Sequence, residues 1–252
     1  MITNLVRKIP FAVELYRRIK PHAVTPTPHR PSFRALLEPL GEPFVSQLDS
    51  MYEGAPQPGS DGALHDMDRS VLISPQQGIW IFDLCRKVKP EATLEIGMAY
   101  GFSTMFFLAA LKANRSGRHT AVDPYQDHWH GIGKALIAKL QISDQCQASD
   151  ELGVQAMVRF GLEKRSFDVI FIDGSHRFDD VLVDFTLAAQ ICAPGGYIVM
   201  DDMWMPSIKK AVSFIRTNRT DFTEIKTPIQ NIAAFQLNGP DKREWDHFAE
   251  FN

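Results

Sequence analysis

The chain has 252 residues, of which 44% are hydrophobic and 23% are charged, and its formal net charge is -3. This length suits one sizeable α/β domain with an appendage and is short for two full domains. The composition argues against a disordered protein, and the absence of a basic block gives no reason to expect nucleic acid as a partner. No window is long and uncharged enough for a membrane span, so we expect no transmembrane segment. We expect a cytoplasmic location, with which the sparse cysteines agree.

The three cysteines are too few and too scattered for a disulfide framework or a zinc site. Cys85 and Cys192 lie within apolar stretches, and Cys146 stands alone. We therefore predict buried free thiols, which fits a reducing compartment.

Residues 1–65 are rich in proline, which breaks helices into short pieces and leaves extended connectors. We predict that they form a helical N-terminal extension with a role as a lid or an oligomer contact, followed by one domain over residues 66–252. The basic and apolar residues of segment 1–20 fit a packing or homo-oligomer helix, with contact to a membrane surface as the alternative. Segment 56–62 (PQPGSDG) is predicted to be an exposed loop.

From residue 75 onward, apolar residues recur with a regular spacing. This spacing predicts helices over residues 78–88, 102–113, 132–140, 151–162, 178–191 and 207–217. Strands are predicted over residues 92–96, 119–122, 167–172, 197–200, 222–226 and 232–237, with a Pro-Gly-Gly turn at 194–196. A further strand is predicted before Ser149. The alternation predicts an α/β, Rossmann-like, doubly wound sheet of seven strands, in which the final hairpin makes one strand antiparallel.

A glycine-rich turn follows the first strand of this predicted sheet and reads Glu95-Ile96-Gly97-Met98-Ala99-Tyr100-Gly101. Gly97 and Gly101 allow the backbone to approach a ligand closely. Ser103 lies at the start of the next helix, where free N–H groups and the helix dipole favour a carboxylate. Because ligands of open α/β sheets bind at the carboxyl ends of the strands, we predict a cofactor site here.

The spacing of this turn is ExGxxxG, which differs from the GxGxxG of dinucleotide-binding enzymes and makes a nicotinamide cofactor less favoured. Asp123 ends the second predicted strand, where an acidic side chain can accept hydrogen bonds from both ribose hydroxyls. The alternative is a purely structural turn with an aspartate that caps a helix.

Three carboxylates follow two neighbouring strands of the predicted sheet: Asp173 ends one, and Asp201 and Asp202 end the next. Carboxylates that converge on one cleft repel one another unless they are neutralised, and Mg²⁺, which prefers oxygen ligands, is the simplest solution. The alternative is that Asp201 and Asp202 only cap the helix that follows.

His176 comes three residues after Asp173 and is predicted to face the same cleft. A metal ion that binds a hydroxyl oxygen lowers the pKa of that hydroxyl, and a nearby imidazole then removes its proton. We therefore predict His176 as the general base, with a solvated loop histidine as the alternative.

Four segments resemble class I methyltransferases of the family that includes macrolide sugar O-methyltransferases, and more distantly catechol O-methyltransferases. These segments are LEIGMAYGFST (94–104), VDPYQDHWHGIG (122–133), FIDGSHRFDDVLVDF (171–185) and PGGYIVMDDM (194–203). The resemblance covers about residues 70–237, and its most specific part is DGSH with the later Asp-Asp pair.

The resemblance implies roles for individual residues. It assigns S-adenosylmethionine binding to Glu95, Gly97, Gly101, Ser103 and Asp123, and adenine contact to Ser149 or Asp150. It assigns metal binding to Asp173, Asp201 and Asp202, although the macrolide enzymes typically have Glu-Asp where this chain has Asp201-Asp202. His176 matches the proposed base of the sugar-methylating relatives.

We therefore expect an S-adenosylmethionine- and Mg²⁺-dependent O-methyltransferase that acts on a hydroxyl of a small molecule or glycosyl unit. Two alternatives stay open: an enzyme of the same fold with hydroxylase or NAD chemistry, and a cofactor-binding subunit without catalysis. Segment 66–77 is a candidate lid, and His128, Trp129 and His130 are candidates to line the cleft.

Overall fold

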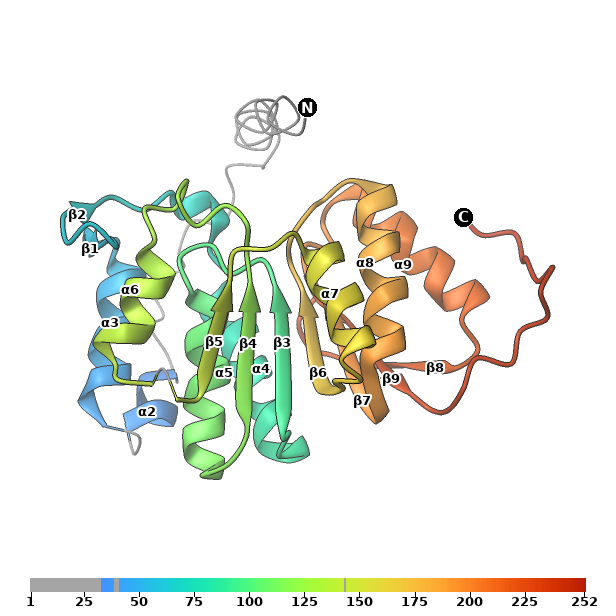
Figure 1. Cartoon of the computed structure of the whole chain (residues 1–252), viewed down its shortest axis with the longest axis horizontal. Coiled ribbons are helices and arrows are strands. Elements are labelled where there is room, and N and C mark those ends of the chain that lie inside the picture. Colours follow the sequence, from blue (N-terminus) through green and yellow to red (C-terminus); the bar gives the residue numbers. More distant parts are fainter. Residues whose placement is uncertain (1–32, 39–40, 143) are drawn as a thin grey trace.

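The computed structural model describes residues 33–38, 41–142 and 144–252, so the helix predicted over 1–20 lies outside the described residues. The centre of the fold is a seven-stranded sheet with the order β5-β4-β3-β6-β7-β9-β8 (Figure 1). Its strands are β3 (Ala92–Ile96), β4 (Arg118–Val122), β5 (Cys146–Ser149), β6 (Phe167–Ile172), β7 (Cys192–Met200), β8 (Phe222–Ile225) and β9 (Ala233–Leu237). Only β9 runs against the other six, because it pairs antiparallel with both β7 and β8. The predicted Rossmann-like α/β fold is confirmed.

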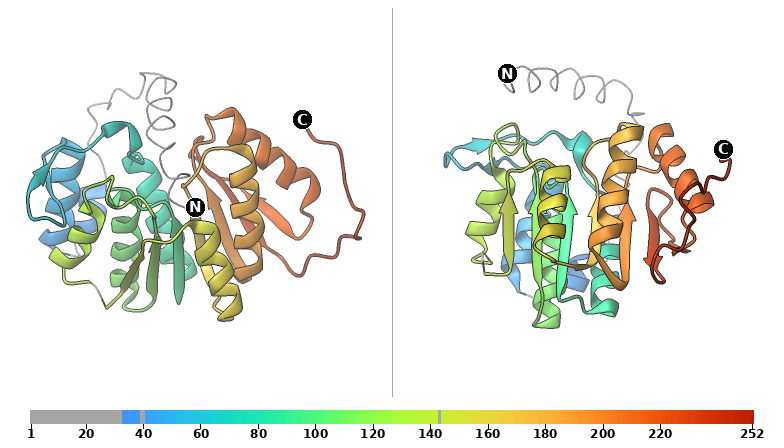
Figure 2. Two further views of the ribbon diagram at one scale, coloured as in Figure 1. Left: turned by 45° about the horizontal axis from the view of Figure 1, so that its top comes forward. Right: turned by 45° about the vertical axis from the view of Figure 1, so that its right-hand side comes forward.

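Helices cover both faces of this sheet and make three layers (Figure 2). They are α4 (Pro75–Val88), α5 (Phe102–Asn114), α6 (Ile132–Lys139), α7 (Gly153–Leu162), α8 (Phe178–Ile191) and α9 (Pro206–Asn218). Alternate residues of each strand point to opposite faces. Val169 and Phe171 join the core with α4 and α5, whereas Ile170 and Ile172 join the core with α7, α8 and α9.

Helix α5 is enclosed by its neighbours along most of its length. Every residue from Phe102 to Leu111 is buried. A helix that is apolar on all sides belongs in an interior, and α5 packs between the sheet, α4 and the N-terminal α3 (Glu42–Glu53). This burial fixes the helix that begins at the glycine turn.

The Pro-Gly-Gly segment at 194–196 lies inside strand β7, not before it as predicted. Phe167 of β6 pairs with Cys192, and Val169 pairs next with Tyr197, so the intervening residues of β7 bulge out of the ladder. Glycine and proline are typical of such irregularities, which explains why they were interpreted as the end of a connection.

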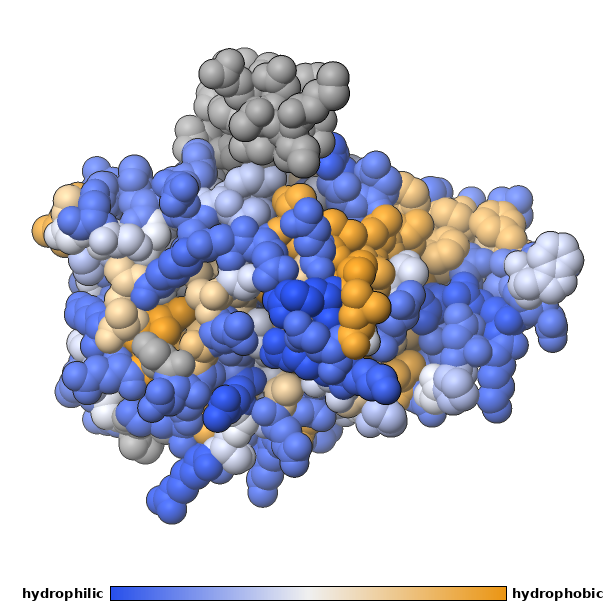
Figure 3. All heavy atoms as spheres, viewed as in Figure 1, coloured by the Kyte–Doolittle hydropathy of each residue, from blue (hydrophilic) through white to orange (hydrophobic). Residues whose placement is uncertain are grey.

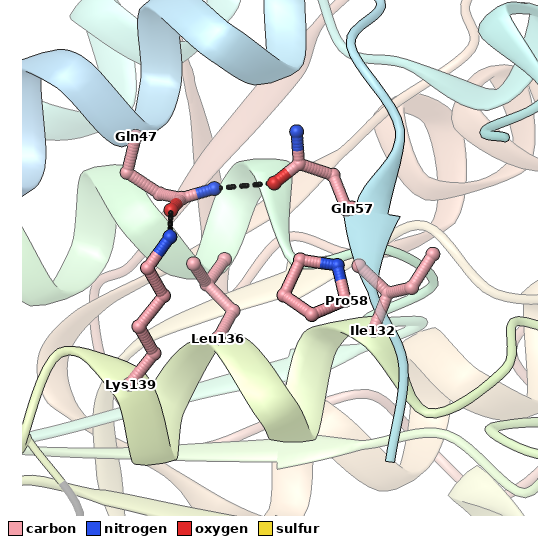
Figure 4. A pocket seen from close by; sticks show the side chains of 6 residues that line it. All are labelled: Gln47, Gln57, Pro58, Ile132, Leu136 and Lys139. Carbon is pink, nitrogen blue, oxygen red and sulfur yellow. Dashed lines mark hydrogen bonds between the residues drawn. The ribbon is translucent and has the colours of Figure 1, made fainter. Parts of the chain in front are cut away.

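The prediction of an exposed loop over 56–62 is wrong for its first part. Strands β1 (Gln57–Pro58) and β2 (Leu64–His65) form a small antiparallel hairpin. The Gln57 side chain is buried and accepts a hydrogen bond of 2.7 Å from Gln47 of α3 (Figure 4). Lys139 of α6 donates to the same Gln47 at 2.9 Å, so the hairpin is tied to two helices.

The described residues before position 65 share the core of the rest of the chain. Phe44, Leu48 and Met51 of α3 are buried in the same cluster as Phe106 of α5. A shorter helix, α2 (Phe33–Leu37), contributes Phe33 and Leu37 to it. The described part of the predicted extension therefore packs directly on the sheet domain.

Exposed apolar side chains gather over α7 and α8 on the face seen in Figure 3. They include Val154, Val158 and Leu162, which follow one another at intervals of four residues along α7. All three cysteines are buried and free, as predicted for the two that lie in apolar stretches. Among the described residues, we find no helix with the length and apolar character to cross a membrane.

Candidate active site

The carboxyl ends of the central strands lie side by side at one edge of the sheet. Their hydrogen bonding continues one residue past each strand: the Gly97 N–H donates to Val122 at 2.8 Å, and the Asp173 N–H donates to Ile96 at 2.9 Å. The Asp201 N–H likewise donates to Ile172 at 3.1 Å. These bonds fix the start of the glycine turn next to the acidic strand ends.

Gly97 occupies a position that only glycine fits. Its φ is 98°, and a Cβ atom there would overlap with the carbonyl oxygen of Asp173. The backbone of β3 therefore crosses directly against the end of β6. Gly101, with φ of 87°, begins α5 and leaves the free N–H groups of that helix at the turn.

Glu95 lies beneath the turn and is completely buried. Its carboxylate accepts hydrogen bonds from Ser103 at 2.6 Å and from Thr104, and it lies 3.0 Å from His119 Nε2. His119 Nδ1 in turn is 2.8 Å from the Thr93 hydroxyl. The predicted binding residues Glu95 and Ser103 thus contact each other and hold the first turn of α5 against β3.

Asp123 ends β4 and faces the same turn. Its carboxylate accepts from the Ala99 N–H at 2.7 Å and from the Tyr125 N–H at 2.8 Å. Burial raises the pKa of Asp123 above its ordinary value, although these hydrogen bonds oppose the rise. Gln126 is also buried, and it donates to Ala99 O at 2.9 Å and to Asp123 at 3.3 Å.

One atom of Gln126 is left over in this arrangement. Its Oε1 is buried and has no hydrogen-bond partner among the described residues. A buried amide oxygen without a donor is costly, so a ligand with a hydroxyl or amine beside the turn would satisfy it.

The two residues predicted to contact adenine lie after β5. Ser149 donates to Glu151 at 2.7 Å, and the exposed Asp150 pairs with Lys134 of α6. The Asp123 N–H donates to Ser149 O at 2.9 Å, which places this loop next to the end of β4.

The second half of the site is a cluster of two carboxylates and one imidazole. Ligand atoms of Asp173, His176 and Asp202 all lie within 4.8 Å of one another. His176 Nε2 is 2.8 Å from Asp202 Oδ2 and 3.6 Å from Asp173 Oδ1. The structure therefore brings these three predicted residues together, next to the glycine turn.

Charge in this cluster shifts the acidity of every member. Burial opposes protonation of His176, but hydrogen bonds and charge attraction from Asp173 and Asp202 outweigh it and raise its pKa to about 10. Burial raises the pKa of Asp173 to about 6 despite its contact with His176. Burial also acts on Asp202, but the His176 bond and charge prevail and lower its pKa to about 2. The positive charge of protonated His176 thus balances the negative charge of the Asp202 carboxylate.

Asp201 lies outside this cluster. Its Oδ1 accepts from Gln77 Nε2 at 2.5 Å and from Asn231 Nδ2 at 3.0 Å. Burial, followed by the charges of Asp173 and Asp202, raises its pKa well above the ordinary value. Of the three predicted metal ligands, two face His176 and the third faces two amides.

The predicted lining residues lie in different surroundings. Trp129 packs edge-on against Tyr100 of the glycine turn, at 5.1 Å between ring centroids. His130 instead stacks on His65 of the β1–β2 hairpin at 4.0 Å, and His128 is exposed. In the candidate lid, the Asp68 N–H donates to the Tyr100 hydroxyl at 3.0 Å, so this segment contacts the turn.

Sequence reasoning missed four polar residues of the site: Gln77, His119, Gln126 and Asn231. His119 had a signal, since it is a polar residue within an apolar strand. The other three come from loops and a helix start, where polar residues are ordinary.

Comparison with known proteins gives a family match for the central part of the chain. Residues 94–203 match the model of a methyltransferase domain family, and this range includes the glycine turn, Asp123 and the acidic cluster. A curated relative, an uncharacterized protein of Acanthamoeba polyphaga mimivirus, is 42% identical over 52 residues. That match covers 19% of this chain and 24% of the relative, well under two thirds of its length.

Solved structures share the fold at low sequence identity. The O-methyltransferase TomG from Streptomyces achromogenes, in complex with S-adenosylmethionine, has a TM-score of 0.56 at 17% identity, covering 79% of this chain and 91% of its own. An O-methyltransferase from Bacillus cereus has a TM-score of 0.57 at 19% identity, covering 82% and 93%. A putative caffeoyl-CoA O-methyltransferase from Staphylococcus aureus has a TM-score of 0.58 at 13% identity, covering 91% and 98%.

These structures share the architecture of this chain, and at their low sequence identity they show the fold alone. The match to a methyltransferase domain family thus applies to the part of the chain from within β3 to the turn after β7.

Proposed function

We propose that the protein is an O-methyltransferase that acts, with the help of a divalent cation, on a hydroxyl group of a small molecule or glycosyl unit. The observation that carries the proposal is the Asp173–His176–Asp202 cluster beside the glycine turn. A base next to hard oxygen ligands suits deprotonation of a hydroxyl, which is a poor nucleophile while protonated. The similar O-methyltransferase structures support the same reaction.

The residues around the turn fit S-adenosylmethionine. Asp123 supplies a buried carboxylate for ribose hydroxyls, and the orphaned Gln126 Oε1 supplies a second acceptor. The tight Gly97–Gly101 backbone and the free N–H groups of α5 suit the methionine carboxylate. We assign Glu95 and Ser103 to holding this turn, and Ser149 and Asp150 to the adenine side.

The acidic cluster fits a divalent cation. Asp173 and Asp202 lie close enough to contact one histidine nitrogen, so their oxygens can also meet at one ion. Asp201 is the third carboxylate of the proposed set, with Oδ1 already used by two amides. Magnesium is the simplest candidate.

In the proposed methyl transfer, the cofactor, the cation and the protein side chains each have a defined role. When bound, S-adenosylmethionine supplies an electrophilic methyl group, and a divalent cation supplies Lewis acidity that favours ionisation of the acceptor hydroxyl. His176 accepts the hydroxyl proton, and the carboxylates of Asp173 and Asp202 stabilise the resulting imidazolium. The turn and the strand ends contribute by holding the reacting groups in line.

We also propose that residues 1–65 serve as a lid or an oligomer contact beside the catalytic domain over 66–252. The contact between Asp68 and Tyr100 supports a covering role for the adjoining segment 66–77. That the protein forms a homo-oligomer is likewise a prediction.

The test of the proposed function is transfer of a labelled methyl group from S-adenosylmethionine to a panel of glycosyl and phenolic hydroxyl compounds. We expect label on oxygen, loss of transfer in EDTA and recovery with Mg²⁺. Equal transfer in EDTA would overturn the metal-assisted part, and failure of the protein to bind S-adenosylmethionine would overturn the whole proposal.

Asp123→Asn should weaken S-adenosylmethionine binding about 10- to 100-fold, because hydrogen bonds to a charged group contribute about 1.5–3 kcal/mol. Asp123 binds ribose best when it is ionised. Because its pKa is raised, Asp123 becomes protonated at a higher pH than an ordinary aspartate does. Wild-type affinity should therefore fall on mild acidification, and the variant should lose this part of the pH dependence. Isothermal titration calorimetry over a pH series measures both effects; an identical pH profile in the two proteins would contradict the ribose role.

Binding of Mg²⁺ should lower the pKa of His176 by about 1–3 pH units, because a cation on the same carboxylates repels the imidazolium. Without a metal ion, the pKa of about 10 keeps His176 protonated at neutral pH and unable to act as a base. NMR titration of the imidazole with and without Mg²⁺ measures the change. An unchanged pKa at saturating Mg²⁺ would show that the ion binds elsewhere.

A further inference from the structure

Two amide side chains from distant parts of the chain meet at the Asp201–Asp202 turn. Gln77 comes from the start of α4, and Asn231 precedes β9. Both donate to Asp201 Oδ1, at 2.5 Å and 3.0 Å respectively. The end of β7 is thus held from two sides by neutral donors.

Asn231 contacts every residue of the segment 201–204. Its Nδ2 also donates to Asp202 Oδ1 at 3.3 Å, and its Oδ1 accepts from the Trp204 N–H at 3.2 Å. Its backbone carbonyl accepts from the Met203 N–H at 3.1 Å. One asparagine therefore uses both ends of its side chain and its main chain on this turn.

The turn needs such support because its backbone is unusual. Asp202 has φ of 58°, in the left-handed region that non-glycine residues seldom adopt, although aspartate tolerates it better than most. This conformation directs one oxygen of Asp202 toward Asn231 and Trp204 Nε1, and the other toward His176. The position of the carboxylate beside His176 depends on the turn.

Gln77 has a second task that explains why it is a glutamine. Its Oε1 accepts from the Ser74 N–H at 2.8 Å and completes the capping box of α4. A glutamate would serve the cap equally well. It would, however, set a fourth carboxylate against Asp201, whereas the amide offers a hydrogen.

We propose that Gln77 and Asn231 form an amide clamp whose function is to position Asp202 against His176 and the cation site. They act through Asp201 and the 201–204 backbone, so they are positioning residues and not catalytic ones. The inference rests on the proposed function for its catalytic meaning, but the placement of Asp202 can be tested without any metal or acceptor.

The test compares Asn231→Ala with Asn238→Ala, and Gln77→Met with Ser74→Ala. Asn238 lies at the opposite end of β9 with an exposed side chain, which makes it a matched control. Ser74→Ala removes the capping hydroxyl that bonds the Gln77 N–H but leaves the Gln77–Asp201 bond. The Gln77 pair therefore separates loss of the cap from loss of the clamp.

Three measurements are made on each full-length protein: a metal-free crystal structure, Mn²⁺ binding followed by electron paramagnetic resonance, and S-adenosylmethionine binding by calorimetry. In Asn231→Ala and Gln77→Met we expect Asp202 to leave hydrogen-bond distance of His176. We expect Mn²⁺ affinity to fall at least about 10-fold, because the loss of a metal ligand or of the residue that orients it typically has an effect of this size. Cofactor affinity should stay within about twofold, and the controls should behave as wild type.

If Asp202 keeps its place beside His176 in both clamp variants, the clamp is overturned, whatever Mn²⁺ does. If wild type fails to bind Mn²⁺, the metal-assisted reaction is overturned, and the crystal structures alone decide the clamp. Should Asn231→Ala not fold, Gln77→Met against Ser74→Ala carries the same comparison.

Discussion

Gly97→Ala is expected to abolish measurable S-adenosylmethionine binding and to destabilise the fold by about 2–5 kcal/mol, which adds the cost of overpacking to that of an unfavourable φ. The added methyl group would overlap with the carbonyl oxygen of Asp173, and backbone cannot move aside as a flexible side chain can. Strands β3 and β6 would have to separate at their tips, where both halves of the site begin. Chemical denaturation and calorimetry measure the two losses.

The chain offers a matched control for this substitution. Gly62 also has a positive φ, of 78°, but nothing lies within 4 Å of a Cβ atom placed there. Gly62→Ala should therefore show only the cost of the backbone conformation and leave cofactor binding intact. Equal effects at the two positions would mean that contact between the strand tips is unimportant.

His176→Ala is expected to lower the rate of methyl transfer about 100- to 10,000-fold, the usual contribution of general base catalysis. The affinity for S-adenosylmethionine should hardly change, because His176 contacts the acidic cluster and not the glycine turn. Single-turnover kinetics with an acceptor identified by the methyl-transfer screen measure the rate, and calorimetry measures the affinity.

His128→Ala is the control for the loss of another histidine, since His128 is exposed. It should retain nearly wild-type rates. A His176→Ala protein that also kept its rate would remove the base from the proposed mechanism, while the match of residues 94–203 to a methyltransferase domain would stand.

Much of the fold could be predicted because local patterns and tertiary packing agree. Strand β6 matches its prediction over Phe167–Ile172, since a short, nearly continuous apolar run is typical of a parallel strand that is buried on both faces. Helix α8 likewise matches over Phe178–Ile191. The bulge in β7 could not be predicted, because proline and glycine indicate turns and irregular strands alike.

The candidate site, like the fold, could be predicted only in part. Strand order places Asp123, Asp173, His176 and Asp202 at one edge, so their meeting followed from topology. The hydrogen-bond partners of Asp201 could not be predicted from the strand order, because the Gln77–Asp201 bond joins residues that are 124 positions apart. A single sequence carries no local signal for such a bond, and the burial of Gln57 is a similar case.

The completely enclosed α5 has a consequence for how such an enzyme can diversify. It begins directly after the glycine turn that we assign to the cofactor, and Phe102–Leu111 have no solvent-facing side on which a polar or larger residue could be accepted. Sequence variation in this helix, next to the proposed cofactor site, is therefore restricted by the packing around it. The β1–β2 hairpin and residues 66–74 are held to the rest of the molecule by a few hydrogen bonds and include exposed positions, so their sequence is less restricted. New acceptor preferences should therefore arise by remodelling these outer segments over an unaltered cofactor platform.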